Sequence, residues 1–274
     1  MPVHDDLGTR MKEYYEGISK TKLMRRTPVM IRIDGKAFHT FTKGFKKPFD
    51  EILIKTMQET TKYLCENIQG CVLGYTQSDE ISLVLVDYKK LNSAAWFDYE
   101  VQKMCSIAAS MATMAFNRFF AKNVEELRKY ERSYYTRVLS EACEKGAMFD
   151  ARVFNIPKEE VTNCIYWRQL DASRNSVQMV GQANFSHKEL QDKSCNIIQD
   201  MLMEQKSINW NDFPTYQKRG TCVIKEEYLP YNPALGYEDC DVNEMNYRTR
   251  WVIDKDIPIF KGEGREYIDK LISF

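Results

Sequence analysis

Histidine is scarce in this sequence, and cysteine shows no ordered spacing. The three histidines, His4, His39 and His187, lie far apart along the chain, which argues against a histidine-rich metal site. The eight cysteines include no Cys-x-x-Cys motif and no Cys/His pair at the spacing of zinc ligands. We therefore expect reduced thiols rather than a disulfide framework, as is usual in the cytoplasm.

Long hydrophobic runs are also lacking. The closest approach to a membrane span, residues 104–116, is too short to cross a bilayer and is flanked by Lys103 and Arg118, so we interpret it as a buried helix. Residues 1–10 carry acids and no apolar run, unlike a secretory signal peptide. The sequence also contains no low-complexity tract or internal repeat. A soluble, cytoplasmic protein is the expectation.

Neither sign of charge is in excess, because 39 basic residues balance 39 acidic ones. A protein that binds RNA through a broad positive field is usually basic, so an RNA partner would meet local patches here. The chain has 274 residues, of which 43% are hydrophobic, and is long enough to bury a substantial core. These features fit an enzyme-sized globular protein and identify no reaction.

The hydrophobic pattern predicts an α+β fold on an antiparallel or mixed sheet. An apolar, β-branched strand is expected at residues 29–33, before the turn-forming pair Asp34-Gly35. Apolar residues at helical spacing then predict a helix over residues 52–67. Strands at 71–76 and 81–86 are joined by residues 77–80, a hairpin-length connection. The other expected elements are a helix at 98–122, a strand at 152–154, two helices within 166–200 with a polar break near 173–176, strands at 220–225 and 251–253, and a loop over most of 231–247.

Two aspartates are expected to meet at one edge of this sheet. Asp34 follows the first strand and Asp79 lies at the tip of the hairpin. If the intervening helix is a crossover, the first two strands are parallel and both aspartates lie at the same end of the sheet. Such a carboxylate pair suits Mg²⁺, in the manner of a polymerase palm or a nucleotidyl cyclase. Taken singly, each aspartate is more typical of a turn or a solvated loop than of a metal site.

The loop between the first strand and its helix, residues 35–50, combines glycine, lysine and phenylalanine. Gly35 allows a tight turn, after which backbone N–H groups would cradle phosphates. The lysines of the loop supply positive charge for a triphosphate. Phe38 and Phe41 would stack on a base or anchor the loop in the core, and core packing is the commoner outcome. The lysines are Lys36, Lys43, Lys46 and Lys47.

Several motifs resemble the signature of the tRNA-His guanylyltransferase family. They are Arg-Ile-Asp-Gly-Lys-Ala-Phe-His at 32–39, Lys47-Pro48, Asp50 and Gly-Tyr-Thr-Gln-Ser-Asp-Glu at 74–80. Further matches extend over most of the chain, at Lys103, at 149–152 and 167–169, at Lys193, and at 209–211 and 218–220. The resemblance implies a palm-like fold and a 3′-to-5′ nucleotidyltransferase that acts on tRNA with ATP and GTP.

The resemblance also assigns expected roles to individual residues. Asp34, Asp79 and the Gly35 carbonyl would hold two Mg²⁺ ions, with Glu80 as a third acid of the catalytic set. Nucleotide-binding roles fall on Gly35, Lys36, Ala37, Phe38, His39, Lys47, Asp50 and Ser78. RNA-binding roles fall on Lys103, Arg152, Lys193 and Lys218. The resemblance further implies a homotetramer.

One segment departs from the eukaryotic pattern. Residues 173–176 read Ser-Arg-Asn-Ser, where the eukaryotic enzymes carry His-Ile-Asn-Asn, a segment tied to guanosine addition on tRNA-His. The chain is thus more similar to the bacterial and archaeal Thg1-like branch, which repairs 5′-truncated tRNAs with a template. Guanosine addition at position −1, a nucleotidyl-cyclase-like activity and a non-catalytic RNA-binding module remain alternatives. We expect a catalytic core over residues 1–140 that residues 141–274 complete as one compact unit.

Overall fold

The computed structural model describes residues 6–228 and 247–274, and their centre is a six-stranded sheet. The strand order is β4-β1-β3-β2-β5-β6, and every neighbouring pair is antiparallel. Because β1 and β2 both run antiparallel to β3, they point in the same direction, as the crossover argument predicted. The strands are β1 Val29–Gly35, β2 Cys71–Gln77, β3 Glu80–Leu85, β4 Phe149–Asn155, β5 Thr221–Tyr228 and β6 Arg248–Asp254.

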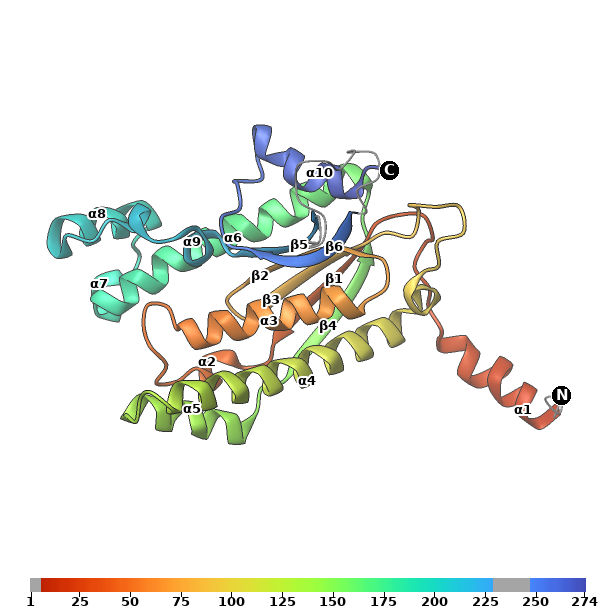
Figure 1. The fold of residues 1–274 in the computed structure, drawn as a ribbon, viewed down its shortest axis with the longest axis horizontal. Helices are drawn as coiled ribbons and strands as arrows, with labels where there is room; N and C mark the ends of the chain where they lie inside the picture. Colours follow the sequence, from red (N-terminus) through yellow and green to blue (C-terminus); the bar gives the residue numbers. More distant parts are fainter. Residues whose placement is uncertain (1–5, 229–246) are drawn as a thin grey trace, which may run out of the picture.

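Helices cover both faces of the sheet (Figure 1). One core lies under α3 and α4, where Ile31 and Ile33 of β1 meet Met57 and Phe116. The opposite core lies under α6 and α10 and receives Met30. This alternation follows from the period of two in a strand, so that Arg32 and Asp34 lie on the α6 side. The helices are α1 Asp6–Met11, α2 Phe38–Phe41, α3 Glu51–Asn67, α4 Val101–Arg128, α5 Tyr134–Lys145, α6 Lys158–Asn184, α7 His187–Leu190, α8 Cys195–Lys206, α9 Thr215–Arg219 and α10 Glu266–Ile272.

The predicted break near residues 173–176 is wrong, because α6 runs through it without interruption. Its polar side chains bond back to the backbone instead of ending the helix. The Ser173 hydroxyl donates to the Gln169 carbonyl at 3.0 Å, and the Ser176 hydroxyl donates to the Ser173 carbonyl at 2.9 Å. The helix ends only before Phe185, where the chain turns toward α7 and α8.

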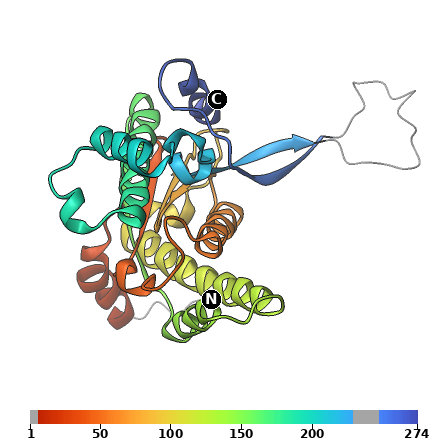
Figure 2. The ribbon, with the colours of Figure 1, turned by 90° about the vertical axis from the view of Figure 1, so that its left-hand side faces the viewer.

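Other boundaries differ from the expectations in smaller ways. The helix expected at residues 98–122 is α4, which begins at Val101 and continues to Arg128. The strands expected at 220–225 and 251–253 are the longer β5 and β6, which Figure 2 shows as a ribbon projecting from the body. The loop expected at 231–247 lies outside the described residues except for its last position. No helix among the described residues has the length and apolar character needed to cross a bilayer.

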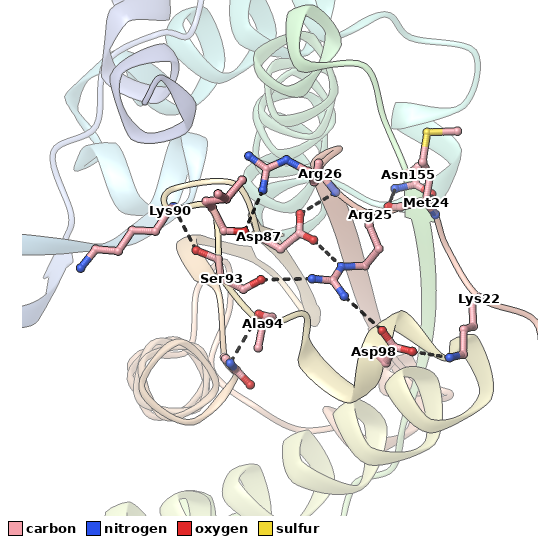
Figure 3. A network of polar contacts seen from close by, with 12 residues as sticks. Lys22, Met24, Arg25, Arg26, Asp87, Lys90, Ser93, Ala94, Asp98 and Asn155 are labelled. Atoms are coloured by element: carbon pink, nitrogen blue, oxygen red, sulfur yellow. Dashed lines mark hydrogen bonds and ion pairs between the residues drawn. The ribbon is translucent and has the colours of Figure 1, made fainter.

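A polar network fastens the segment before β1 to the end of β3 (Figure 3). Asp87, only 1% exposed, accepts hydrogen bonds from Arg25 Nε at 2.6 Å and from the Arg26 backbone at 2.8 Å. Arg25 also reaches the exposed Asp98 at 3.1 Å. This network lies at the opposite end of the strands from Asp34 and Asp79, because β1 starts and β3 ends here.

Candidate active site

The ends of β1 and β3 bring the two predicted aspartates together. Asp34 pairs in register with Glu80, the first residue of β3, and the Gly35 amide donates to the Asp79 carbonyl at 3.1 Å. Asp79 precedes β3 in the tight turn after β2, in which Ser78 has a φ of +50°. The two carboxylates therefore lie at the same sheet edge, as the strand pattern predicted.

The environment of both carboxyl groups disfavours their charged forms. Burial, followed by the neighbouring charges of Glu80 and Asp150, raises the pKa of Asp34. Burial is also the largest cause of the raised pKa of Asp79, and the Asp34 charge adds to it. A hydrogen bond from the Ser78 hydroxyl at 3.0 Å acts in the opposite direction. Two crowded carboxylates that resist ionisation in this way gain from a nearby cation.

A cleft of about 570 Å³ opens over this pair of aspartates. The cleft is walled by residues 37–39 and 45–48 of the loop after β1 on one side and by Met179 and Gln182 of α6 on the other. Most of the predicted nucleotide-binding residues contribute to its lining. These residues are Gly35, Ala37, Phe38, His39, Lys47, Asp50 and Ser78. Lys36 is exposed and is not among the lining residues, and its amide donates to the Met148 carbonyl at 2.8 Å.

The phenylalanines of the loop pack in the core, which is the commoner of the two outcomes expected from the sequence. Phe38 is buried and its ring lies 5.5 Å from Phe116 and 5.2 Å from Phe149, centroid to centroid. A Cβ atom on Gly35 would come within 2.2 Å of the Phe38 ring, so glycine is required there for close approach. The Phe38 side chain thus anchors the loop whose backbone lines the cleft.

Asp50 fixes the other end of the loop. Its carboxylate accepts hydrogen bonds from the Leu53 amide at 3.0 Å, the Lys46 amide at 3.0 Å and the Tyr135 hydroxyl at 2.7 Å. The first of these caps α3. Asp50 is buried, so its main contribution in this structure is to hold the backbone beside Lys47 in place.

Glu80 lies between two arginines rather than open to the cleft. Its carboxylate is buried and accepts bonds from Arg168 Nε at 2.6 Å and Nη2 at 2.8 Å, and Arg32 Nη2 lies 3.3 Å away. Arg168 also donates to Asp171 at 2.8 Å. This bidentate pair ties α6 to the hairpin that carries Asp79. The geometry favours a positioning role for Glu80.

Sequence reasoning assigned no role to Arg32, Arg168 or Asp150. Side chains alternate between the two faces of β1, so the sequence could have placed Arg32 on the same face as Asp34. Arg168 belongs to the motif at residues 167–169, but its contact with Glu80 spans 88 residues. Asp150 pairs in register with Asp34 across β1 and β4 and adds to the negative charge at this edge.

The four expected RNA-binding residues do not gather in one place. Arg152 lies on β4 in register with Arg32, exposed, and pairs with Asp150 at 3.3 Å. Lys103 is exposed near the start of α4, about 15 Å along the helix from Thr113. The Thr113 hydroxyl accepts a hydrogen bond from the Phe149 amide, and Phe149 pairs with Gly35 across the sheet. Lys193 is exposed after α7. Lys218 is 8% exposed and donates to the Asn211 carbonyl at 2.5 Å, which is the environment of a structural lysine.

No group of three or more His, Cys, Asp or Glu side chains forms a metal-binding cluster within residues 6–228 and 247–274. The donors at the sheet edge are the Asp34 and Asp79 carboxylates with the adjacent backbone. Mg²⁺ is commonly held by one or two carboxylates, with water and substrate phosphates as its other ligands. The donor set is therefore of the kind that fits this ion.

Comparison with known proteins gives a consistent result. Residues 8–157 match the family model described as tRNAHis guanylyltransferase. A bacterial tRNA(HIS) guanylyltransferase (Thg1)-like protein, solved in complex with ATP, is 42% identical with a TM-score of 0.78, and the match covers 97% of this chain and 99% of that chain. A structure of such a protein in complex with GTP is 40% identical, with a TM-score of 0.76, and the match covers 98% and 100%. The tRNA(His) guanylyltransferase of Debaryomyces hansenii is 26% identical over 217 residues, 74% of this chain and 76% of that protein. This chain belongs to the tRNA-His guanylyltransferase family and is a nucleotidyltransferase.

Proposed function

We propose that this enzyme adds nucleotides in the 3′-to-5′ direction to the 5′ ends of truncated tRNAs, guided by the opposite strand. The observation that carries the proposal is the Asp34–Asp79 pair beneath a cleft lined by Gly35, residues 37–39 and Lys47. The ATP and GTP complexes of the similar bacterial proteins support these nucleotides as substrates. The proposal includes a cytoplasmic homotetramer as its working form.

Two Mg²⁺ ions would be held by Asp34, Asp79 and the Gly35 carbonyl. The raised pKa values of both aspartates support this assignment, because a divalent cation would offset the burial and the like-charge repulsion that raise them. When bound, Mg²⁺ would neutralise phosphate charge and favour the ionised form of the attacking hydroxyl group. The protein's own part is to keep the carboxylates close and the cleft open to a triphosphate.

The remaining residues of the cleft would position two reacting groups. Backbone groups of residues 35–39 would hold the incoming triphosphate, and Lys47 and Ser78 would bind the 5′ end that is activated. In activation, a 5′-phosphate oxygen attacks the α-phosphorus of ATP or GTP and pyrophosphate leaves. In the addition step, the 3′-hydroxyl of the incoming nucleotide attacks the activated 5′-phosphorus, and the nucleoside monophosphate attached during activation leaves. Pyrophosphate leaves instead where the RNA already carries a triphosphate.

Residues 173–176 support repair over guanosine addition to full-length tRNA-His. Asn175 and Ser176 line a smaller hollow of about 80 Å³ that also touches Ser78 and Gly220. The Ser176 hydroxyl is occupied by the Trp210 indole, which donates to it at 2.9 Å. In place of the His-Ile-Asn-Asn segment, this face carries two serines whose hydroxyl groups are already bonded within the protein. Watson–Crick pairing would then select the nucleotide.

The decisive experiment compares two substrates. The enzyme, Mg²⁺ and nucleoside triphosphates would be incubated with a tRNA lacking its first 5′ nucleotide and, separately, with full-length tRNA-His, and the 5′ ends sequenced. We expect higher kcat/KM on the truncated tRNA and incorporation of the paired nucleotide. A strong preference for guanosine addition to full-length tRNA-His contradicts repair. Cyclised or dinucleotide products formed from nucleotides alone would favour the cyclase alternative.

A further inference from the structure

A second concave surface lies away from the aspartates, where α4 meets α5. Figure 1 shows α5 beside the C-terminal end of α4, below α2. The concavity measures about 620 Å³ and is lined by Arg128, Arg132 and Arg137, with Ser133, Tyr134 and Thr136 between them. We call this surface the arginine pocket. None of the expected catalytic, nucleotide-binding or RNA-binding residues belongs to it.

The charge of the arginine pocket is unbalanced. Residues 128–140 contain four basic residues and one acidic residue, in a chain whose net charge is zero. The acid, Glu131, accepts a hydrogen bond from Ser133 at 2.7 Å and lies 3.8 Å from Lys46. Arg128 and Arg132 form no ion pair with any residue that the structure describes. Arg137 differs, because its Nε lies 4.0 Å from the Glu141 carboxylate. The pocket therefore presents two guanidinium groups, those of Arg128 and Arg132, that have no ion-pair partner among the described residues.

Exposed aromatic side chains flank these arginines. Tyr130 is 90% exposed and Tyr134 is 71% exposed. The Arg137 guanidinium lies 5.0 Å from the centre of the Tyr134 ring. Tyrosines that bury so little of their rings contribute little to folding, whereas free aromatic faces beside arginines are typical of surfaces that stack on unpaired bases.

The arginine pocket adjoins the loop that walls the catalytic cleft. Tyr135, next to the pocket residue Tyr134, donates to Asp50, which lines the cleft. The Lys46 ammonium lies 4.2 Å from the centre of the Tyr135 ring. Lys46, which lines the cleft, thus links the cleft wall to Tyr135 and to Glu131 beside the pocket.

We infer that the arginine pocket binds the phosphodiester backbone of the RNA substrate and stacks an unpaired base on Tyr134. The inference rests on the proposed function in taking RNA as the substrate. Planar guanidinium groups bind phosphate oxygens in pairs, and an exposed ring accepts any base. The pocket would hold a single-stranded part of the RNA while its 5′ end lies over Asp34 and Asp79.

The test measures RNA binding by the full-length protein. The probe is a fluorescein-labelled RNA hairpin with a recessed 5′ end and a single-stranded 3′ tail, titrated at several salt concentrations. The variant is Arg128→Ala with Arg132→Ala. Its matched control is Arg118→Ala with Lys122→Ala, which removes two charges from exposed positions of α4 outside the pocket.

We expect the pocket variant to bind the probe about tenfold or more weakly, with a log–log salt slope smaller by about 1.4, because each single-strand phosphate contact contributes about 0.7. The control should stay within about twofold of the wild type. Tyr134→Ala should weaken binding of the tailed hairpin but not of a blunt one, and Tyr134→Phe should restore it. Equal losses in the pocket variant and the control would overturn the inference.

Two further measurements distinguish RNA from a nucleotide ligand and from a protein partner. Binding of ATP and of inorganic triphosphate should be unchanged in the pocket variant, and a loss there would assign the pocket to a nucleotide instead of RNA. A changed oligomer mass with unchanged RNA binding would make the pocket a protein interface and overturn the inference. If the wild type binds RNA through the pocket but adds no nucleotide, the proposed function fails and this inference stands.

Discussion

At neutral pH and without metal, the charged Asp34 and Asp79 side chains should make the protein less stable than uncharged side chains at the same positions would. The pKa of each is raised in the folded state, so each stabilises the fold only when protonated and loses that contribution as the pH rises through the raised value. Asp34→Asn or Asp79→Asn should therefore raise the Tm in EDTA at pH 7.5. The gain should disappear below about pH 3, where the wild-type carboxyl groups are protonated in both the folded and the unfolded state.

The same two variants should lose nucleotide addition altogether and should show no Mg²⁺-dependent rise in Tm. Thermal unfolding with and without Mg²⁺, beside an activity assay, checks both statements. An Asn variant that is less stable than the wild type in EDTA, or one that keeps near-normal activity, would contradict the assignment of these residues as metal ligands.

Arg168→Ala should be among the most destabilising substitutions at the site. It leaves the buried Glu80 carboxylate with only Arg32, at 3.3 Å, and we expect a loss of about 3–5 kcal/mol in urea unfolding. Combining Glu80→Gln with Arg168→Met removes both charges and should recover part of that loss. Glu80→Gln alone should keep more activity than Asp79→Asn. Equal inactivation of these two, with an unchanged fold, would place Glu80 in the chemistry.

Lys47→Ala should impair reaction with 5′-monophosphorylated RNA more than with 5′-triphosphorylated RNA, because the triphosphate end needs no activation. Lys47 lines the cleft, whereas Lys43 of the same loop is exposed outside it and serves as the control. Single-turnover rates on the two RNAs give the comparison. Equal losses on both would assign Lys47 to the incoming triphosphate.

Site residues that lie in short local patterns could be predicted from the sequence, whereas contacts between residues far apart in the sequence could not. Asp34 and Asp79 follow from strand-and-turn patterns within a few residues of each. The Arg168–Glu80 pair depends on how α6 packs over the sheet, and no periodicity specifies that arrangement. Lys218 shows the converse, since a basic residue in a matched motif proved to be buried and bonded to a backbone carbonyl.

At the scale of elements, the spacing of hydrophobic residues indicated which segments are strands and which are helices, whereas the ends of the elements depended on polar side chains. The break expected within α6 failed because Ser173 and Ser176 bond to helix carbonyls when tertiary packing holds the helix. The short helix α5 was not anticipated, although Ser133 and Thr136 form a capping box at its start. Threonine in place of the usual Glu or Gln makes that signal weak in a sequence.

The network around Asp87 offers a prediction about how one segment is fastened to the sheet. Asp87→Ala leaves Arg25 Nε and the Arg26 amide without their acceptor and should cost about 2–4 kcal/mol. Asp98→Ala, which removes the exposed partner of the same arginine, should cost much less. Urea unfolding measures both. Below the unfolding transition, kcat/KM should stay within about twofold of the wild type, because the network lies at the other end of the strands from the aspartates.

At the scale of the whole molecule, the sheet joins the first and second halves of the chain. β4 pairs with β1 along its full length and β5 pairs with β2, so a fragment of residues 1–140 would expose both edges of its three strands. It would also lack α6 and with it the partner of Glu80. We therefore expect the full chain to unfold in one cooperative transition, with equal calorimetric and van't Hoff enthalpies, and activity to vanish in the same temperature range. The fragment alone should give no cooperative transition. Two resolved heat-capacity peaks, or a fragment of residues 1–140 that unfolds cooperatively by itself, would show that the catalytic core is an independent domain.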